Sequence, residues 1–281
     1  MARLRADLRS FGSCLIAYSG GVDSALLAYL AHQELGARAV AVIADTPSLP
    51  RRELAEAREL ATEFGFQLRE IRTAEFDDER YLANPDNRCF YCKHALFDDL
   101  QKIAETEEFA VIAYGENASD IGDYRPGAQA AAKFAVRAPL KEAGLTKADI
   151  RELSAELGMP TADKPEMPCL SSRIPYGESV TTEKLQIIEA AELSLRERGY
   201  ANVRVRHHEN AAGAPLARIE VPPDRIEQLK REIEGVADEL RALGYDEIVV
   251  DPHGYRRGSL NEAIGRRAGD PAAAEVAAGG H

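Results

Sequence analysis

A short segment near the N-terminus combines the residue types that bind phosphate. It follows the apolar run 13–18 and consists of Ser19, Gly20, Gly21, Val22, Asp23 and Ser24. The two glycines permit backbone conformations that a side chain forbids, so backbone N–H groups can converge on an anion. A helix that begins here adds its positive end, and the serine hydroxyls can donate to the same anion. We predict a phosphate-binding loop; the alternative is a tight strand-to-helix turn without a ligand. It is not a Walker loop, because the lysine after the second glycine is missing.

A second polar segment follows the apolar run 110–114. In a parallel sheet the carboxyl ends of the strands meet at one edge, so Gly115, Asn117 and Asp120 should face the same nucleotide as the glycine loop. Carboxylates here and at Asp23 suit a Mg²⁺ ion that bridges phosphates. Arg125, which follows shortly, is a candidate for stabilising phosphate charge. The alternative is an ordinary polar loop.

The four cysteines divide into one core residue and three candidates for chemistry. Cys14 lies in the first apolar run, where a cysteine contributes only packing. Cys89 and Cys92 form a Cys-x-x-Cys pair, and Cys169 follows much later in Met-Pro-Cys-Leu-Ser-Ser-Arg. Three thiolates can hold a [4Fe–4S] cluster with one open iron, or zinc together with a histidine such as His94. A redox pair with an unrelated third cysteine is a further reading, and the spacing alone does not choose.

An Arg-x-Arg pair in the second half suits the phosphate of another ligand. Arg204 and Arg206 lie in the predicted strand 202–207, and side chains alternate along a strand, so both guanidiniums should share one face. Two guanidiniums can bind a phosphate through paired hydrogen bonds. The alternative is a solvated edge strand with ordinary surface charges. The nearby histidines have no metal-site spacing and are expected to be structural or exposed: His207, His208 and His253.

The elements that must position these residues alternate in the first half. Short apolar runs are typical of buried strands, and runs rich in Ala, Leu, Glu and Arg are typical of helices. Strands are predicted at 13–18, 37–44, 67–71 and 110–114, with helices after the glycine loop and at 51–64, 97–106 and 147–157. Such alternation favours βαβ units. We predict an α/β fold, a parallel sheet with helices on both faces.

The second half predicts a smaller α+β domain. Helices are predicted at 182–198 and 224–243, and strands at 202–207, 216–221 and 247–251. The Pro-rich stretch 160–180 is the candidate boundary. We divide the chain into a nucleotide domain (1–160), a second domain that should bind the substrate (161–267) and a disordered tail rich in Ala and Gly (268–281).

The composition excludes several classes of protein. The 281 residues are 45% hydrophobic and 29% charged, and no apolar run approaches the roughly 18 residues that span a bilayer. Charges occupy the first residues, where a signal peptide needs apolar ones, so we expect a cytoplasmic protein without membrane contact. The net charge of −12 makes the chain a poor general binder of nucleic acid. We expect a homo-oligomer that acts on a small molecule.

The glycine loop resembles the pyrophosphate loop of the ATP-pyrophosphatase (PP-loop) enzymes, in which SGGxDS follows an apolar strand. Those enzymes cleave ATP between the α and β phosphates and adenylate a carboxylate, an amide or a base carbonyl. Two further stretches, 87–93 and 168–177, resemble the LarE family, and together with SGGVDS the likeness covers most of residues 10–260. LarE proteins are ATP-dependent sulfur transferases that build the nickel-pincer nucleotide cofactor of lactate racemase.

The LarE resemblance implies a reaction and a sulfur source. ATP would adenylate the carboxylates of pyridinium-3,5-biscarboxylic acid mononucleotide, and sulfur would replace oxygen. In one branch of the family the cysteine that matches Cys169 is consumed and leaves dehydroalanine. The presence of Cys89 and Cys92 favours the other branch, in which three cysteines bind a [4Fe–4S] cluster that carries an extra sulfide. Cys169 and Asp23 are then the catalytic candidates, Asp23 also as a Mg²⁺ ligand, and a sulfide source is a partner.

The resemblance also assigns the substrate phosphate to the second half. The family's C-terminal half has the same Arg-x-Arg, with acidic residues that Glu192 and Glu220 match. Arg204, Arg206 and Glu192 are therefore expected at the phosphate of the mononucleotide. The turn between His207 and Leu216 is longer than is typical of the family.

Three other functions share parts of this pattern. A PP-loop tRNA thiolase with a three-cysteine cluster would need a basic surface, and the net charge of −12 argues against one. An amide-forming PP-loop ligase would use ammonia and a structural zinc. A nucleotide sensor that kept the fold would bind ATP and release no pyrophosphate. Binding to bulk tRNA, metal analysis and pyrophosphate release distinguish these functions from sulfur transfer.

Overall fold

A computed structural model describes residues 1–120, 126–210 and 212–256, and the chain divides into two compact units. Unit 1 comprises Met1–Asp78 and Asn87–Met167, and unit 2 comprises Glu79–Asp86 and the chain from Pro168 onward. The second division lies within the Pro-rich stretch, later than residue 160. Segment 79–86 belongs to unit 2 because the Asn84 side chain donates to the backbone carbonyls of Ile174, Pro175 and Glu178.

The C-terminal part of the predicted second domain, 257–267, and the predicted tail, 268–281, lie outside the described residues. Within the described ranges, no helix is both long enough and apolar enough to cross a membrane.

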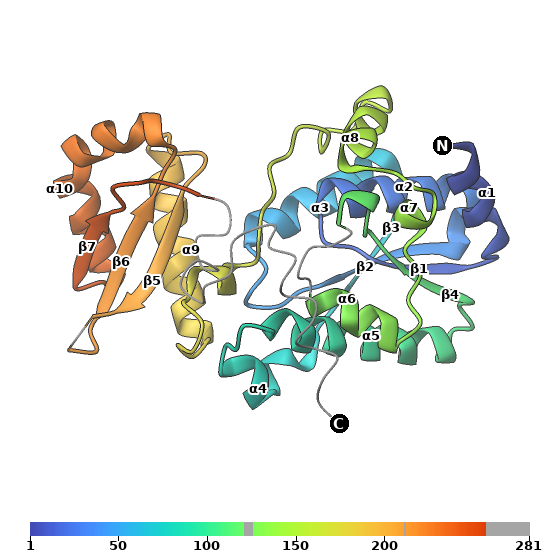
Figure 1. Cartoon of the computed structure of the whole chain (residues 1–281), viewed down its shortest axis with the longest axis horizontal. Helices are drawn as coiled ribbons and strands as arrows, with labels where there is room; N and C mark the ends of the chain where they lie inside the picture. The colour runs from blue at the N-terminus through green and yellow to red at the C-terminus, as the bar shows by residue number, and fades with distance from the viewer. Residues whose placement is uncertain (121–125, 211, 257–281) are drawn as a thin grey trace. The chain divides into compact units, whose positions relative to one another are not determined.

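Unit 1 is built around a four-stranded parallel sheet (Figure 1). Its strands are β1 (Cys14–Ala17), β2 (Ala39–Ala44), β3 (Gln67–Ile71) and β4 (Val111–Tyr114), in the order β3-β2-β1-β4. The chain runs outward from β1 to β3 and then crosses to β4 on the other side of β1. Parallel sheets bind ligands at the carboxyl ends of the strands where the strand order reverses. The loop after β1 lies at that position.

Helices cover both faces of this sheet, because successive residues of a strand point to opposite sides. Cys14 and Ile16 belong to a core shared with one layer of helices: α1 (Ala2–Ser10), α2 (Val22–Leu35), α3 (Arg51–Phe64), α7 (Pro139–Glu142) and α8 (Lys147–Glu156). Leu15 and Ala17 belong to the core on the other face, with α5 (Arg88–Thr106) and α6 (Pro126–Lys133). Burial on both faces explains the uninterrupted apolar strands, and the predicted α/β fold is confirmed.

The helix that carries the cysteine pair begins earlier than the sequence predicts. The spacing predicts a helix over 97–106, whereas α5 begins at Arg88. Cys89 and Cys92 therefore lie near its start, three residues apart on one side of the helix. The short helix α4 (Glu79–Leu82) is also absent from the prediction.

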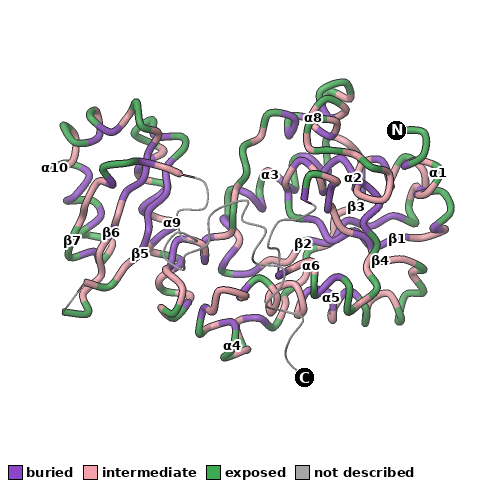
Figure 2. The backbone as a smooth tube through the Cα atoms, in the orientation of Figure 1, coloured by how far each residue is buried: buried purple, intermediate pink, exposed green. Residues whose placement is uncertain are grey.

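Unit 2 contains a three-stranded sheet and two long helices. β5 (Arg204–Glu209) and β6 (Pro215–Glu220) are antiparallel, and β7 (Glu247–Val250) runs parallel to β6. One face of the sheet packs on α9 (Thr182–Glu197) and α10 (Ile226–Ala242) through Val205, Ala217 and Ile219. Figure 2 shows that β5 is buried along most of its length, including the residues on its other face. The predicted small α+β unit is confirmed.

Candidate functional site

The glycine loop joins β1 to α2 and has the geometry of an anion site. Gly20 has a φ of +74°, in the left-handed region that favours glycine. Gly21 is the N-cap of α2, so the helix presents its positive end to the loop. The Ser24 hydroxyl accepts a hydrogen bond from the Ser19 N–H (3.1 Å) and donates one to the Gly21 carbonyl (3.1 Å). These two bonds fix the loop against the first turn of the helix.

Gly115 lets the end of β4 approach the start of α2. A Cβ atom on Gly115 would lie 2.8 Å from the Ser24 nitrogen and 3.1 Å from the Asp23 Cβ. The distance to the Ser24 nitrogen is too short for a side chain to fit without a shift of the backbone, and the distance to the Asp23 Cβ is a tight contact. The second polar segment therefore lies against the glycine loop, as the shared edge of the sheet predicts.

Asp23 is held by donors from two other segments. Lys147, at the start of α8, forms an ion pair with the Asp23 carboxylate, and the Asn117 side-chain amide donates to it at 3.1 Å. The Lys147 N–H donates to Ser119 Oγ at 3.0 Å. The ammonium group of Lys147 thus contacts the carboxylate that the sequence analysis expects to bind Mg²⁺. No local signal identifies it, because it is far from Asp23 in the chain.

Asn117 and Asp120 form a tight turn beside Asp23. The Asn117 N–H donates to the Asp120 carboxylate (3.2 Å), and the Ser119 N–H donates to the Asn117 side-chain carbonyl (2.9 Å). Asn117 thus contacts Asp23 directly, whereas Asp120 is buried and supports the turn. The predicted ATP residue Arg125 lies outside the described residues.

The three candidate cysteines are accessible and belong to different units. Cys89 is exposed and Cys92 is half-buried on α5 in unit 1, and Cys169 is half-buried before the 3-10 helix Leu170–Arg173 in unit 2. Thiolates are suitable ligands for iron and zinc, so the donor chemistry fits the predicted cluster. In the part of the chain that the structure describes, no three Cys, His, Asp or Glu side chains are gathered as metal ligands. The shared cluster stays a prediction.

Two other predictions about sulfur and imidazole groups are confirmed. Cys14 is buried in β1, and burial raises the pKa of its thiol to about 12, so it contributes packing. His207 is buried against the Tyr245 ring (centroids 5.4 Å apart), and burial lowers its pKa to about 4. His207 is therefore a neutral structural residue near neutral pH.

A fully buried ion pair anchors the segment that contains Cys169. Arg173 donates to both carboxylate oxygens of Glu192, at 2.8 and 3.1 Å, and to the backbone carbonyls of Pro168 (2.6 Å) and Cys169 (3.1 Å). Burial opposes ionisation of Glu192, but the charge of Arg173 holds its pKa below the ordinary range. Glu192, predicted at the substrate phosphate, is thus engaged in positioning Arg173.

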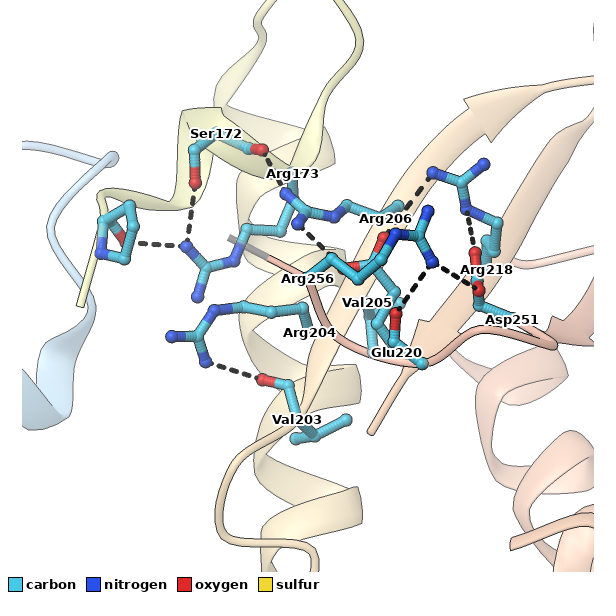
Figure 3. A network of polar contacts seen from close by, with 12 residues as sticks. Ser172, Arg173, Val203, Arg204, Val205, Arg206, Arg218, Glu220, Asp251 and Arg256 are labelled. Carbon is cyan, nitrogen blue, oxygen red and sulfur yellow. Dashed lines mark hydrogen bonds and ion pairs between the residues drawn. The ribbon is translucent and has the colours of Figure 1, made fainter. Parts of the chain in front are cut away.

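Arg204 and Arg206 are buried on the face of β5 opposite Val205 (Figure 3). Arg206 donates to the Ser172 carbonyl (2.7 Å) and pairs with Glu220 (2.8 Å). Burial and the nearby charge of Arg173 lower the pKa of Arg204 to about 10. This burial contradicts the alternative of a solvated edge strand.

Arg218 and Arg256 extend this network beyond what the sequence predicted. Arg218 lies opposite Arg206 across β5 and β6, and its guanidinium is 3.6 Å from Glu220 and 3.5 Å from Asp251. Strand alternation could have identified Arg218, since it places Arg218 and Glu220 on one face. Among residues 126–210 and 212–256, contacts of this network join six arginines and three carboxylates: Arg173, Arg196, Arg204, Arg206, Arg218 and Arg256 with Glu192, Glu220 and Asp251. Guanidinium groups gathered on one face of a strand suit a phosphate.

Known proteins resemble the chain in parts or over nearly its whole length. The family model for NAD synthase matches residues 4–83, which include the glycine loop, and supports the use of ATP. An uncharacterized protein of Synechocystis sp. is 42% identical over 94% of this chain and 97% of its own length. The pyridinium-3,5-bisthiocarboxylic acid mononucleotide synthase of Lactiplantibacillus plantarum is 33% identical over 94% of each chain. A component of the glutamine-hydrolyzing GMP synthase of Methanopyrus kandleri is 31% identical over 65% of this chain and 62% of its own.

Proposed function

Since the chain belongs to the LarE family, we propose that it converts pyridinium-3,5-biscarboxylic acid mononucleotide into the bisthiocarboxylic acid with ATP and sulfide. The observation that carries the proposal is the 33% identity to a synthase of that product over 94% of both chains. A likeness of this extent spans the glycine loop of unit 1 and the arginine network of unit 2.

The glycine loop would bind ATP for activation of the carboxylate. A carboxylate oxygen attacks the α-phosphorus, the bond to the β-phosphate oxygen breaks, and pyrophosphate leaves from an acyl adenylate. The loop N–H groups and the start of α2 suit the negative charge that accumulates on pyrophosphate. Asp23 would bind Mg²⁺ in place of Lys147, with Asn117 beside it.

Sulfur transfer would follow at the activated carbon. A carboxylate is a poor electrophile, whereas AMP is a good leaving group once the carboxylate oxygen is adenylated. Sulfide attacks the acyl carbon, the carbon–oxygen bond to AMP breaks, and a thiocarboxylate, AMP and a proton result. Each carboxylate therefore consumes one ATP.

Cys89, Cys92 and Cys169 are the proposed protein ligands of a [4Fe–4S] cluster. Their thiol groups fit such a cluster in type, and all three are at least partly accessible. A cluster held by three thiolates has one iron with an open position for an exchangeable sulfide. Arg173 would hold the backbone at Cys169, since it donates to the Cys169 carbonyl.

The arginine network would bind the phosphate of the mononucleotide. Arg204 and Arg206 share one face of β5, and Arg218 lies opposite Arg206 on β6. Glu192 would act as a positioning residue through its buried pair with Arg173. A negatively charged ligand would relieve the repulsion between neighbouring guanidiniums.

A reaction with competing nucleophiles tests the proposal. The anaerobically purified chain is incubated with Mg-ATP and the biscarboxylic acid mononucleotide in three arms, with sulfide, with ammonia or with neither. Pyrophosphate release with a thiocarboxylate product in the sulfide arm is expected. An amide product in the ammonia arm alone would favour an amide-forming ligase, which the partial likeness to NAD and GMP synthases makes the second candidate.

The proposed setting is a cytoplasmic homo-oligomer that receives sulfide from a separate donor. The substrate is a small molecule, and the net charge of −12 gives no support for a nucleic-acid partner. Size-exclusion chromatography with light scattering tests the oligomeric state.

A further inference from the structure

Lys164 lies after α8 in unit 1, and its side chain reaches the glycine loop. Its ammonium group donates to the Gly20 carbonyl (3.3 Å) and forms ion pairs with Glu53 (2.7 Å) and Glu56 (2.8 Å) of α3. Arg151 of α8 fixes the backbone of this segment by donating to the Lys164 carbonyl at 2.9 Å. Hydrogen bonds and ion pairs therefore fix both the main chain and the side chain of Lys164.

The charge of Lys164 is already balanced by its surroundings. Burial opposes the charged form, but the hydrogen bonds to Glu53 and Glu56 raise the pKa of Lys164 above its ordinary value. An ammonium group in contact with two carboxylates adds little net positive charge for a distant phosphate. Its effect on a ligand would therefore come from the hydrogen bond to Gly20.

That hydrogen bond fixes the peptide unit between Gly20 and Gly21. The unit is planar and trans, so the Gly20 carbonyl and the Gly21 N–H point in opposite directions. A peptide between two glycines rotates readily, because both residues tolerate either sign of φ. With the carbonyl bonded to Lys164, the Gly21 N–H points away from Lys164.

We propose that Lys164 is a positioning residue that directs the Gly21 N–H at the phosphates of ATP. The inference rests on the proposed function in one respect, that ATP is the ligand of the loop. Lys164 would not touch the nucleotide; it would act through the Gly20–Gly21 peptide.

Lys164→Met removes the donor and keeps the length of the side chain. Calorimetric titration with Mg-ATP should give an affinity about ten-fold lower than that of the parent, as for loss of a hydrogen bond to a charged group. The affinity for the mononucleotide should not change, and Lys164→Arg should recover most of the ATP affinity. Equal ATP affinities for the parent and Lys164→Met would overturn the inference alone. A parent that binds no ATP would overturn the proposed function and the inference with it.

Lys184→Met is the matched control. The Lys184 side chain is 15% exposed, close to the 14% of Lys164, and it pairs with Glu209 (2.9 Å) in unit 2. Its ATP affinity should equal that of the parent, and a loss as large as that of Lys164→Met would overturn the inference. If circular dichroism shows that Lys164→Met is unfolded, Lys164→Gln replaces it, with an expected loss of about three-fold or more. Parent-level ATP affinity in the glutamine variant would also overturn the inference.

Discussion

The glycine loop of unit 1 and the arginine network of unit 2 both suit phosphate, but they are built differently. The loop relies on backbone groups and the start of α2, and its nearby lysines, Lys147 and Lys164, are paired with carboxylates. The network relies on side-chain charge, supplied by buried arginines such as Arg204 and Arg206. One site depends on the direction of N–H groups and the other on the balance of charge.

This difference predicts different responses to substitution. A backbone site fails when an added side chain turns or displaces its N–H groups, since no remaining group can take over. A site of several guanidiniums loses affinity in steps, because the remaining arginines still attract the phosphate. The variants that follow test this distinction.

The largest effect on pyrophosphate release is expected from Gly115→Ala in unit 1. The new methyl group would lie 2.8 Å from the Ser24 nitrogen, so the start of α2 must move. Pyrophosphate release should fall by about a hundred-fold, as for a displacement of catalytic groups. Pyrophosphate release at the parent rate would show that the loop tolerates displacement. It would contradict the claim that the loop depends on the direction of its N–H groups.

Gly235→Ala is the control for a glycine outside the loop. Gly235 lies within α10, and its nearest atom to an added Cβ is 3.8 Å away. The variant should keep the parent activity, and its free energy of unfolding should rise by about 0.5–1 kcal/mol because alanine favours a helix.

The cysteines extend the comparison, since two lie in unit 1 and one in unit 2. If the three bind one cluster, alanine at Cys89, Cys92 or Cys169 should remove iron, brown colour and sulfur transfer together. Cys14→Ala should lose none of these, because Cys14 is buried in β1. Iron analysis, absorption spectra and product assays check the pattern.

A sacrificial cysteine would give another pattern. Cys89→Ala would then complete one turnover, and the chain would become lighter by one H₂S at Cys169. Mass spectrometry of the chain after a single turnover detects that loss. An intact Cys169 after several turnovers with added sulfide supports the cluster, and dehydroalanine at that position contradicts it.

A smaller and selective effect is expected in unit 2. Arg204→Ala and Arg206→Ala should each weaken binding of the mononucleotide by about ten- to a hundred-fold, since each removes a hydrogen bond to a charged group. ATP affinity should stay at the parent level. Arg206→Ala should also lower the free energy of unfolding by about 3 kcal/mol, because it removes a partner of buried Glu220.

Arg241→Ala is the matched control on the surface of unit 2. Its side chain is 58% exposed, and it forms an ion pair with Asp238 of the same helix. Calorimetric titration and urea unfolding of the three variants separate binding from stability. Equal losses of mononucleotide and ATP affinity in Arg204→Ala would place the substrate phosphate outside the network.

The smallest effect concerns the pH dependence of stability. Burial lowers the pKa of His207 to about 4 from an ordinary value of 6.5, so the folded state disfavours its proton. The stability from neutral His207 is complete above the ordinary pKa and is lost as pH falls toward the folded pKa. At a pH of about 5 the loss is at most about 2 kcal/mol. Urea unfolding should show that the free energy of unfolding falls less with pH in His207→Phe than in the parent. The control His253→Phe alters an exposed residue and should show the same loss as the parent. Equal losses in all three chains would refute this assignment.

Local patterns in the sequence predicted most of the sheet and its helices. The predicted bounds of α3 (51–64) and β3 (67–71) agree with the structure to the residue: α3 is rich in Glu, Ala, Leu and Arg and lies between Pro50 and Gly65, and β3 begins two residues after that glycine. The start of α5 was missed, since residues 88–96 mix cysteine, aromatic and charged residues without a helical apolar pattern. Tertiary context overrides weak local propensity in such segments.

The candidate sites were predictable only where their residues are close together in sequence. The SGGVDS loop and the Arg-x-Arg pair are local patterns. In the structure the loop leads into α2, and both arginines lie on β5. Lys147 at Asp23 and Lys164 at Gly20 are more than a hundred residues away from their partners. Ion pairs and hydrogen bonds of this kind depend on the fold, so spacing carries no sign of them.

The central claim is that ATP activates a carboxylate oxygen, which sulfur then replaces. The most direct test uses substrate with isotopically labelled carboxylate oxygens and follows the label by mass spectrometry after reaction with Mg-ATP and sulfide. Adenylation predicts labelled AMP, unlabelled pyrophosphate and a thiocarboxylate product, because AMP leaves with the oxygen that attacked the α-phosphorus. Unlabelled AMP, or label in pyrophosphate, would contradict the account.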